Sequence, residues 1–194
     1  MKAFERVLKS LAVLVVLFAG MSSLAGAADL SRAVILVASD RLAGSPFEKT
    51  VILATPLPQG GHMGFVVNRP TGVKLESLLP GQESARNVVD QVYAGGPMLD
   101  SVVFAVTRKP PADDSKAVPL IPGLVAVMDG ETVDQILETS PNDARYFVGL
   151  MVWSPGELDE QVGKGAWEVR PASVEAVLPA RSTDLWKSLE GTEI

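Results

Sequence analysis

The chain contains no cysteine and a single histidine, His62, among its 194 residues. Without cysteine it can form no disulfide, no thiol nucleophile and no thiolate-bound metal site. The acidic clusters at residues 113–114 and 157–160 lack the alternating spacing around a glycine that a calcium loop requires. We therefore expect neither a metal nor another cofactor.

Basic clusters are also missing, since the longest basic run is Arg108 followed by Lys109. The whole chain carries 17 Lys and Arg against 23 Asp and Glu; without residues 1–27 the counts are 14 against 22, a net charge near −8. Such a surface repels phosphate backbones, because nucleic-acid binding relies on clustered Lys and Arg that displace counterions. We expect no nucleic-acid partner.

Only one apolar run comes near the length of a membrane span, at residues 11–20. Three basic residues precede it, and the small residues Ala-Gly-Ala follow at 25–27. This order is typical of a secretory signal peptide, and the run has about half of the ~20 residues needed to cross a bilayer. We expect residues 1–27 to be a signal peptide cleaved near Ala27, so that the protein is exported, periplasmic in a Gram-negative cell, and off the membrane after cleavage. The alternative is that the run is retained as a membrane anchor.

Residues 28–194 are long enough for a single domain, which at this size buries roughly 70% of its unfolded surface. Short apolar segments rich in β-branched residues favour strands, and apolar residues at helical spacing favour helices. The predicted strands span residues 33–39, 50–54, 64–67, 88–94, 102–107, 120–128 with an interruption at 122–123, 144–153 and 167–170. The predicted helices span residues 73–79, 131–139, 155–162, 173–178 and 183–189.

The order of these elements indicates the fold class. Strands come in local clusters and helices do not alternate with them, which disfavours a doubly wound parallel sheet. Neighbouring strands pair most economically as antiparallel hairpins. We therefore expect an α+β fold with a mainly antiparallel sheet bent into a pseudo-barrel, together with several short helices. Two helix starts carry capping residues, Asp129 or Thr132 for the helix at 131–139 and Ser154 for the helix at 155–162.

Two segments run from apolar residues into polar turns: residues 64–70 have the sequence GFVVNRP, and residues 93–97 have the sequence YAGGP. Turns of this composition expose polar groups and backbone amides. Arg69 can bind a carboxylate or phosphate through two hydrogen bonds, and Asn68 can both donate and accept. If the two turns meet in space, they form a candidate binding surface made of Asn68, Arg69, Gly95, Gly96 and Pro97.

The alternative, structural interpretation is that the residues of these two turns stabilise the fold and bind no partner. Asn68 would hold the backbone of its own turn, and Arg69 would pair with a nearby acid such as Glu48 or Asp40. Gly95 and Gly96 are followed by no Gly-Lys-Ser or Gly-Lys-Thr, so they do not form a phosphate loop. Their expected role is a tight turn with positive φ.

A catalytic hypothesis can be built from Ser39, Asp40 and His62, the residue types of a Ser-His-Asp triad. A nucleophile elbow is missing, because residues 43–47 (AGSPF) lack the second glycine of Gly-x-Ser-x-Gly. The alternative interpretation makes His62 a surface loop histidine that precedes a strand.

The motifs taken together resemble the AlgH/YqgE family of bacterial proteins. Matching segments occur in the family's order and spacing, and they span essentially all of the chain after residue 27: residues 36–42, 46–53, 64–70, 93–97, 149–158, 165–167 and 184–186. The resemblance implies an α+β fold with a sheet bent into a pseudo-barrel. It implies no established biochemical activity, and the family's name reflects a proposed regulatory link to alginate production.

Two departures from the family concern location and one loop. Family members are usually cytoplasmic, whereas we expect this chain to carry an export signal. Residues 55–62 (TPLPQGGH) differ from the acidic and His or Asn residues usual there. Our first hypothesis is an exported, non-enzymatic binding or regulatory protein that recognises a small anion, a peptide or a protein partner. The alternatives are a hydrolytic enzyme that uses Ser39, Asp40 or His62, and a transcriptional regulator.

Overall fold

The computed structural model describes residues 28–178 and 185–189. Its strands are β1 (Val34–Ala38), β2 (Val51–Pro56), β3 (His62–Val66), β4 (Pro70–Lys74), β5 (Gln91–Ala94), β6 (Met98–Thr107), β7 (Ala117–Ile121), β8 (Leu124–Val127), β9 (Ala144–Trp153) and β10 (Trp167–Pro171). Its α-helices are α1 (Leu75–Leu78), α2 (Gly130–Thr139), α3 (Glu157–Gly163), α4 (Val174–Val177) and α5 (Leu185–Leu189). Short 3₁₀ turns lie at Asp40–Leu42, Glu83–Asn87, Asp114–Lys116 and Pro141–Asp143.

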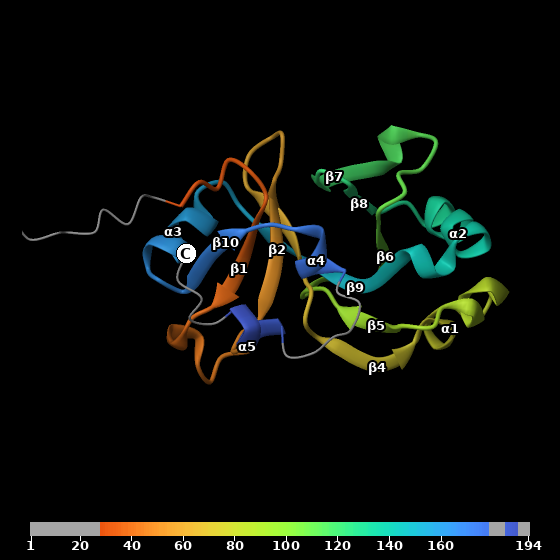
Figure 1. The fold of residues 1–194 in the computed structure, drawn as a ribbon, viewed down its shortest axis with the longest axis horizontal. Coiled ribbons are helices and arrows are strands. Elements are labelled where there is room, and N and C mark those ends of the chain that lie inside the picture. Colours follow the sequence, from red (N-terminus) through yellow and green to blue (C-terminus); the bar gives the residue numbers. More distant parts are fainter. Residues whose placement is uncertain (1–27, 179–184, 190–194) are drawn as a thin grey trace, which may run out of the picture.

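The strands form one sheet in the order β10-β1-β2-β3-β9-β6-β8-β7, with β5 paired to β9 and β4 paired to β5 (Figure 1). In the described residues every pair is antiparallel except β5 with β9. The sheet curves into a half-barrel with short helices around it. This confirms the predicted α+β class and the mainly antiparallel, bent sheet.

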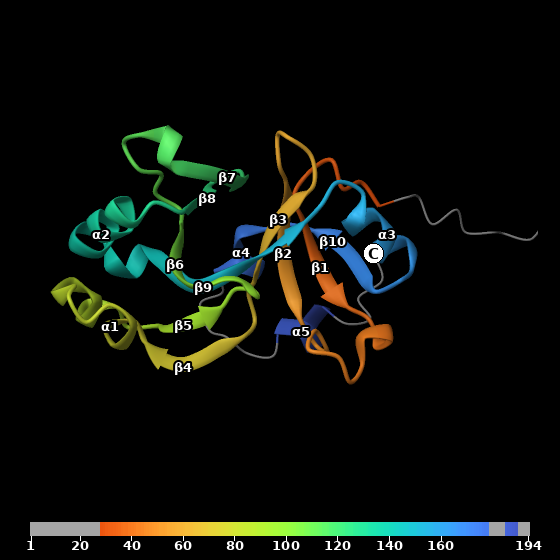
Figure 2. The same cartoon turned by 180° about the vertical axis from the view of Figure 1, so that it is seen from behind.

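Strand β9 joins the two halves of the molecule. Its first half pairs with β5 and β6, and its second half pairs with β3. In both views β4, β5, β6 and α2 lie toward the start of β9, while β1, β2, β10 and α3 lie toward its end (Figures 1 and 2). Because β9 belongs to both groups, residues near its start can meet side chains from several distant segments.

Aromatic packing at this junction forms the centre of the largest core cluster. Phe65 of β3 lies with its ring centroid 5.1 Å from that of Phe147 on β9 and 6.0 Å from that of Phe104 on β6. Tyr93 of β5 adds a ring 5.8 Å from Phe147. All four side chains are buried, so the core fixes how β3, β5, β6 and β9 cross.

Several predicted elements are confirmed closely. The helix expected at 131–139 is α2, and the strand expected at 144–153 is β9. Asp129 caps α2, because its carboxylate accepts from the backbone N–H of Thr132 at 2.9 Å. The interruption expected at 122–123 is the turn of the β7–β8 hairpin. Of the last predicted helix, residues 185–189 form α5, and residues 183–184 lie outside the described part of the chain.

Other boundaries were wrong, for identifiable physical reasons. Residues 73–79 were expected to be a helix, but β4 continues to Lys74 because its backbone pairs with β5. The Thr71 hydroxyl donates to Val92 O at 2.7 Å and helps to hold that pairing. Ser154 does not cap a helix from 155, since Gly156 has a φ of 81° and α3 begins at Glu157. Residues 88–90 precede β5, and β6 begins earlier than expected, at Met98.

Among the residues that the structure describes, no helix is both long and apolar enough to cross a membrane.

Candidate functional site

The two polar turns predicted from the sequence do meet in space. The backbone N–H of Ala94 donates to the carbonyl oxygen of Arg69 at 2.9 Å, and Pro70 pairs with Tyr93 in the β4–β5 ladder. We call residues 68–70 and 94–97 the paired turns. Their proximity satisfies the geometric condition for a shared surface, and their individual contacts show what each residue does there.

Asn68 serves the backbone of a neighbouring turn. Its side-chain oxygen accepts from the N–H of Val51 at 2.9 Å, and its amide nitrogen donates to the carbonyl oxygen of Lys49 at 2.8 Å. Lys49 has a φ of 55°, a left-handed conformation that is uncommon for a side-chain-bearing residue. The amide therefore stabilises the strained entry into β2, a backbone role like the one expected in the structural interpretation but in a neighbouring turn and not its own.

Arg69 behaves differently from that interpretation. Its Nη2 donates to Thr50 Oγ1 at 2.6 Å and to the backbone oxygen of Glu48 at 3.2 Å, so it binds neutral acceptors. The expected ion pair with Glu48 or Asp40 was wrong, because the Glu48 carboxylate instead accepts from Gly44 N at 2.8 Å. Burial lowers the pKa of the Arg69 guanidinium, which has no ion pair within the described residues.

Gly95 and Gly96 are required by a close crossing of backbones. Gly95 has no positive φ, which corrects the expected tight turn. A Cβ on Gly95 would overlap the carbonyl oxygen of Gly149, and a Cβ on Gly96 would overlap the backbone of β9. Gly95 also donates to Val148 O and accepts from Val66 N, both at 2.8 Å. The glycines thus let one segment bond to β9 and β3 together.

Exposed apolar residues follow directly after the paired turns. Met98 is 51% exposed and Leu99 is 54% exposed, and Pro97 before them is also exposed. Leu99 has a φ of 54°, a conformation that costs about 1 kcal/mol or more for a residue with a Cβ. A leucine that is both strained and exposed is unusual, and such a residue is a candidate contact for a partner.

The hypothetical triad of Ser39, Asp40 and His62 is not assembled. His62 pairs with Pro56 at one end of β2, whereas Ala38, beside Ser39, donates to Thr50 at the other end. Six residues of strand separate those ends, a distance of roughly 20 Å. The structure therefore places the serine and the histidine too far apart for proton transfer.

His62 is also not a surface residue, which corrects the alternative expectation. It is 7% exposed, because β3 begins at His62 and not at Gly64. Its Nε2 bonds to the carbonyl oxygen of Leu30 at 2.9 Å, and a carbonyl can only accept, so Nε2 carries the proton. The ring therefore ties residue 30 to the sheet.

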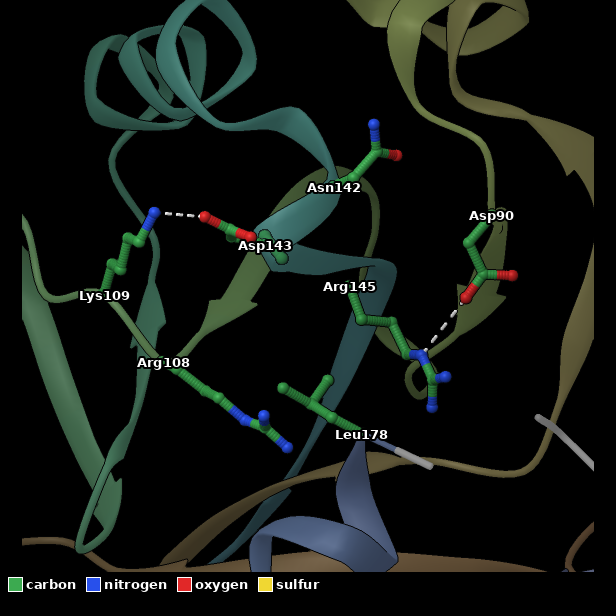
Figure 3. A pocket seen from close by; sticks show the side chains of 8 residues that line it. Asp90, Arg108, Lys109, Asn142, Asp143, Arg145 and Leu178 are labelled. Atoms are coloured by element: carbon green, nitrogen blue, oxygen red, sulfur yellow. Dashed lines mark hydrogen bonds and ion pairs between the residues drawn. The ribbon is translucent and has the colours of Figure 1, made fainter. Parts of the chain in front are cut away.

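A separate pocket of about 360 Å³ opens at the start of β9 (Figure 3). Its walls come from the segment after β6, the segment before β5, the turn before β9 and the end of α4. The lining residues are Asp90, Arg108, Lys109, Asn142, Asp143, Ala144, Arg145 and Leu178. Sequence reasoning missed this site, because its residues come from four distant segments and its one visible signal was the pair Arg108–Lys109.

Arg145 forms the fixed, buried side of the pocket. Its Nε lies 3.4 Å from Asp90 Oδ2, and its Nη1 donates to the backbone oxygen of Val177 at 2.7 Å. The guanidinium carbon also lies 4.4 Å from the centroid of the Tyr93 ring, within the range of a cation–π contact. These contacts join β5, β9 and α4 and hold one positive charge in place.

Arg108 differs from Arg145, because its side chain makes no hydrogen bond or ion pair with any described residue. Lys109 pairs with Asp143, and Arg145 pairs with Asp90. The lining thus contains three cations and two carboxylates, and the charge of Arg108 is uncompensated.

Within residues 28–178 and 185–189, no three His, Asp or Glu side chains lie close enough together to bind a metal ion. Two described arginine side chains are suited to bind an anion instead: Arg69 in the paired turns and Arg108 in the pocket.

Comparison with known proteins gives a consistent result. A family profile described as AlgH-like matches residues 35–191. A UPF0301 protein of Chlorobaculum parvum is 31% identical over 156 residues, which cover 78% of this chain and 81% of that protein. The UPF0301 protein SCO2948 of Streptomyces coelicolor is 29% identical over 162 residues, which cover 80% and 82% respectively.

Two solved structures share the fold. The solution structure of the AlgH protein from Pseudomonas aeruginosa superimposes with a TM-score of 0.67 at 21% identity and covers 83% of this chain and 87% of that one. The crystal structure of protein DIP2367 from Corynebacterium diphtheriae gives a TM-score of 0.64 at 24% identity, with coverage of 81% and 84%. At these identities the similarity concerns the fold alone.

Proposed function

This chain belongs to the AlgH-like family, and we propose that it is an exported, non-enzymatic binding protein. In this proposal the paired turns take a carboxylate of a peptide or protein partner. The family membership supplies the fold, and the proposal about binding rests on the contacts of one side chain.

That side chain is Arg69. A partly buried guanidinium that donates only to neutral oxygens has lost water without gaining an opposite charge, which is costly. Nε and Nη1 of Arg69 make no hydrogen bond with any described residue. A carboxylate from outside can satisfy these donors, and hydrogen bonds between ionised groups are about twice as strong as neutral ones.

The form of the surface favours a peptide or protein over a free ion. The pocket at the start of β9 has no lining residue from the paired turns. Met98 and Leu99 provide exposed apolar area next in sequence, and methionine and arginine are enriched in protein interfaces. The left-handed backbone of Leu99 is the kind of strain that gathers at binding sites.

The two alternative functions have less support. A hydrolase would need Ser39 and His62 together, but they lie at opposite ends of β2. A transcriptional regulator would need a basic face, whereas the chain is acidic with a net charge of −6.

Binding at the paired turns can be tested with fluorescent peptides that carry Asp or Glu beside Leu or Phe. We expect saturable anisotropy changes with the native protein, and an affinity about 10-fold lower for Arg69→Gln, because one charge-assisted contact contributes about 1.5–3 kcal/mol. Arg41→Gln removes the same charge from an exposed arginine without an ion pair in the described residues, and it should bind as the native protein does. Equal affinities for all three proteins would overturn the proposal.

Export and the absence of catalysis need their own measurements. Fractionation of the source cells should find the protein outside the cytoplasm, with a mass that corresponds to a chain starting near Ala28. A cytoplasmic chain of full length would contradict export. Hydrolysis of an ester or phosphate substrate that is lost in Ser39→Ala would contradict the non-enzymatic assignment.

A further inference from the structure

We propose that the pocket lined by Arg108 and Arg145 is a second binding site, which takes a small molecule through an oxyanion group, either a phosphate or a carboxylate. Arg108 contacts the anion directly, and Arg145 supplies a fixed positive charge behind it. This site is distinct from the paired turns, and nothing in the proposal for those turns depends on it.

The first argument is the balance of charge. Both carboxylates of the pocket already face a cation, since Asp90 lies against Arg145 and Asp143 lies against Lys109. Arg108 remains without a partner within the described residues. An uncompensated guanidinium in a pocket of an acidic chain, of net charge −6, attracts an anion to this place.

The second argument is the fixed position of Arg145. Its side chain is 7% exposed and is held by Asp90, by Val177 O and by the ring of Tyr93. A guanidinium that does not need to be ordered on binding loses little conformational entropy when the ligand arrives. Arg108, which extends toward Leu178 in Figure 3, is the side chain that closes on the anion.

The third argument concerns the size and walls of the pocket. A volume of about 360 Å³ falls in the lower range of pockets for small molecules, which span about 300–1,000 Å³. Leu178 and Ala144 give an apolar side on which the non-ionic part of a ligand can rest. Asn142 is committed to the fold, because it accepts from Val89 N and donates to Asn87 O.

The arrangement favours an anionic over a cationic ligand. A cation would have to displace Lys109 or Arg145 from its carboxylate and would face Arg108 as well. An anion meets one free guanidinium and breaks neither ion pair. Arginine binds both phosphate and carboxylate in a two-bond geometry, so the chemistry common to both is what the pocket recognises.

The experiment is calorimetric titration of the full chain with sodium phosphate and, separately, with sodium acetate at low ionic strength. We expect saturable binding of at least one of the two anions, weakened about 10-fold or more in Arg108→Gln because a charge-assisted hydrogen bond is lost. Arg108 makes no hydrogen bond or ion pair with a described residue, so this variant should keep the native melting temperature. Binding of phosphate alone indicates a phosphorylated ligand, and binding of acetate alone indicates a carboxylated one.

Two further variants make the test specific. Asp143→Asn removes a negative charge from the pocket and frees Lys109, so it should strengthen anion binding roughly threefold. Arg41→Gln removes the same charge from an exposed arginine outside both sites and should leave anion binding unchanged. The proposal is overturned if neither anion binds saturably, if Arg108→Gln binds as tightly as the native protein, or if Arg41→Gln weakens binding equally. Loss of binding in Arg69→Gln alone would assign the anion to the paired turns instead.

Discussion

The paired turns and the pocket lie on the same sheet, and both contain arginine side chains. They differ in which of their polar groups already form hydrogen bonds or ion pairs within the protein. In the paired turns, Asn68 uses its amide to hold the entry to β2, and Gly95 uses both backbone groups to bond to β9 and β3. In the pocket, Arg108 makes no bond within the described residues.

This difference has a physical origin. The paired turns sit where three strand segments cross closely, so a specific sequence of small and polar residues is needed to build the crossing itself. The pocket sits where four segments end near one another, and its shape depends on their packing. Most of a recognisable motif can therefore serve a demanding piece of backbone, whereas the residues that line a pocket form no motif.

The largest effect is expected from Gly95→Ala. A Cβ there would overlap the carbonyl oxygen of Gly149, and the crowding should lower the free energy of unfolding by about 3 kcal/mol. Gly81→Ala is the matched control, since Gly81 is exposed, has no positive φ and has open space around its Cα. Urea denaturation measures both. A Gly95→Ala protein as stable as Gly81→Ala would refute the close crossing as the reason for the glycine.

The second effect compares the two arginines of the pocket. Arg145→Gln leaves Asp90 and Val177 O without their cation and removes the contact with Tyr93, so it should destabilise the protein by about 2 kcal/mol. Arg108→Gln should change stability by less than about 0.5 kcal/mol, as surface substitutions usually do. Thermal unfolding of the two variants checks this. Equal losses would show that Arg108 also serves the fold.

A somewhat smaller effect is expected from Asn68→Ala. The buried N–H of Val51 and the carbonyl of Lys49 lose their partners, which should cost about 1–2 kcal/mol. Gln59→Ala, at an exposed residue without a side-chain hydrogen bond in the structure, serves as the control. Unchanged stability of Asn68→Ala in chemical denaturation would mean that Asn68 is available for a ligand after all.

The smallest effect concerns pH and a helix next to the pocket. Hydrogen bonds from the Thr132 side chain and backbone hold the pKa of Asp129 below its ordinary value of 3.8. The charged carboxylate therefore stabilises the folded state fully above pH 3.8, and this contribution is lost as the pH falls through the folded pKa. The urea midpoint of native protein should fall more between pH 5 and pH 3 than that of Asp129→Asn. Parallel falls would remove the role of this cap.

Local patterns were sufficient for much of the fold. The spacing of Val133, Ile136 and Leu137 with the cap at Asp129 defines α2, and the apolar run from 144 to 153 defines β9. The strand β4 was missed because its pairing with β5 is a tertiary contact, which overrides the local preference of residues 73–74 for helix.

The site was less accessible to sequence reasoning. The structural role of Asn68 follows from its turn chemistry, but the reason for Gly95 depends on Gly149, which lies more than fifty residues later. Burial of His62 required knowledge of where β3 begins. The pocket required the simultaneous positions of Asp90, Arg108 and Arg145, which no local pattern contains.

The most direct test of the contrast between the two regions is a phosphate titration followed by ¹⁵N-resolved NMR of the backbone amides. If small oxyanions bind in the pocket and most polar groups of the paired turns serve the fold, saturating shifts should appear at residues 108–109 and 142–145 and should disappear in Arg108→Gln. Shifts confined to residues 68–69 and 94–96, unchanged by Arg108→Gln, would contradict this account.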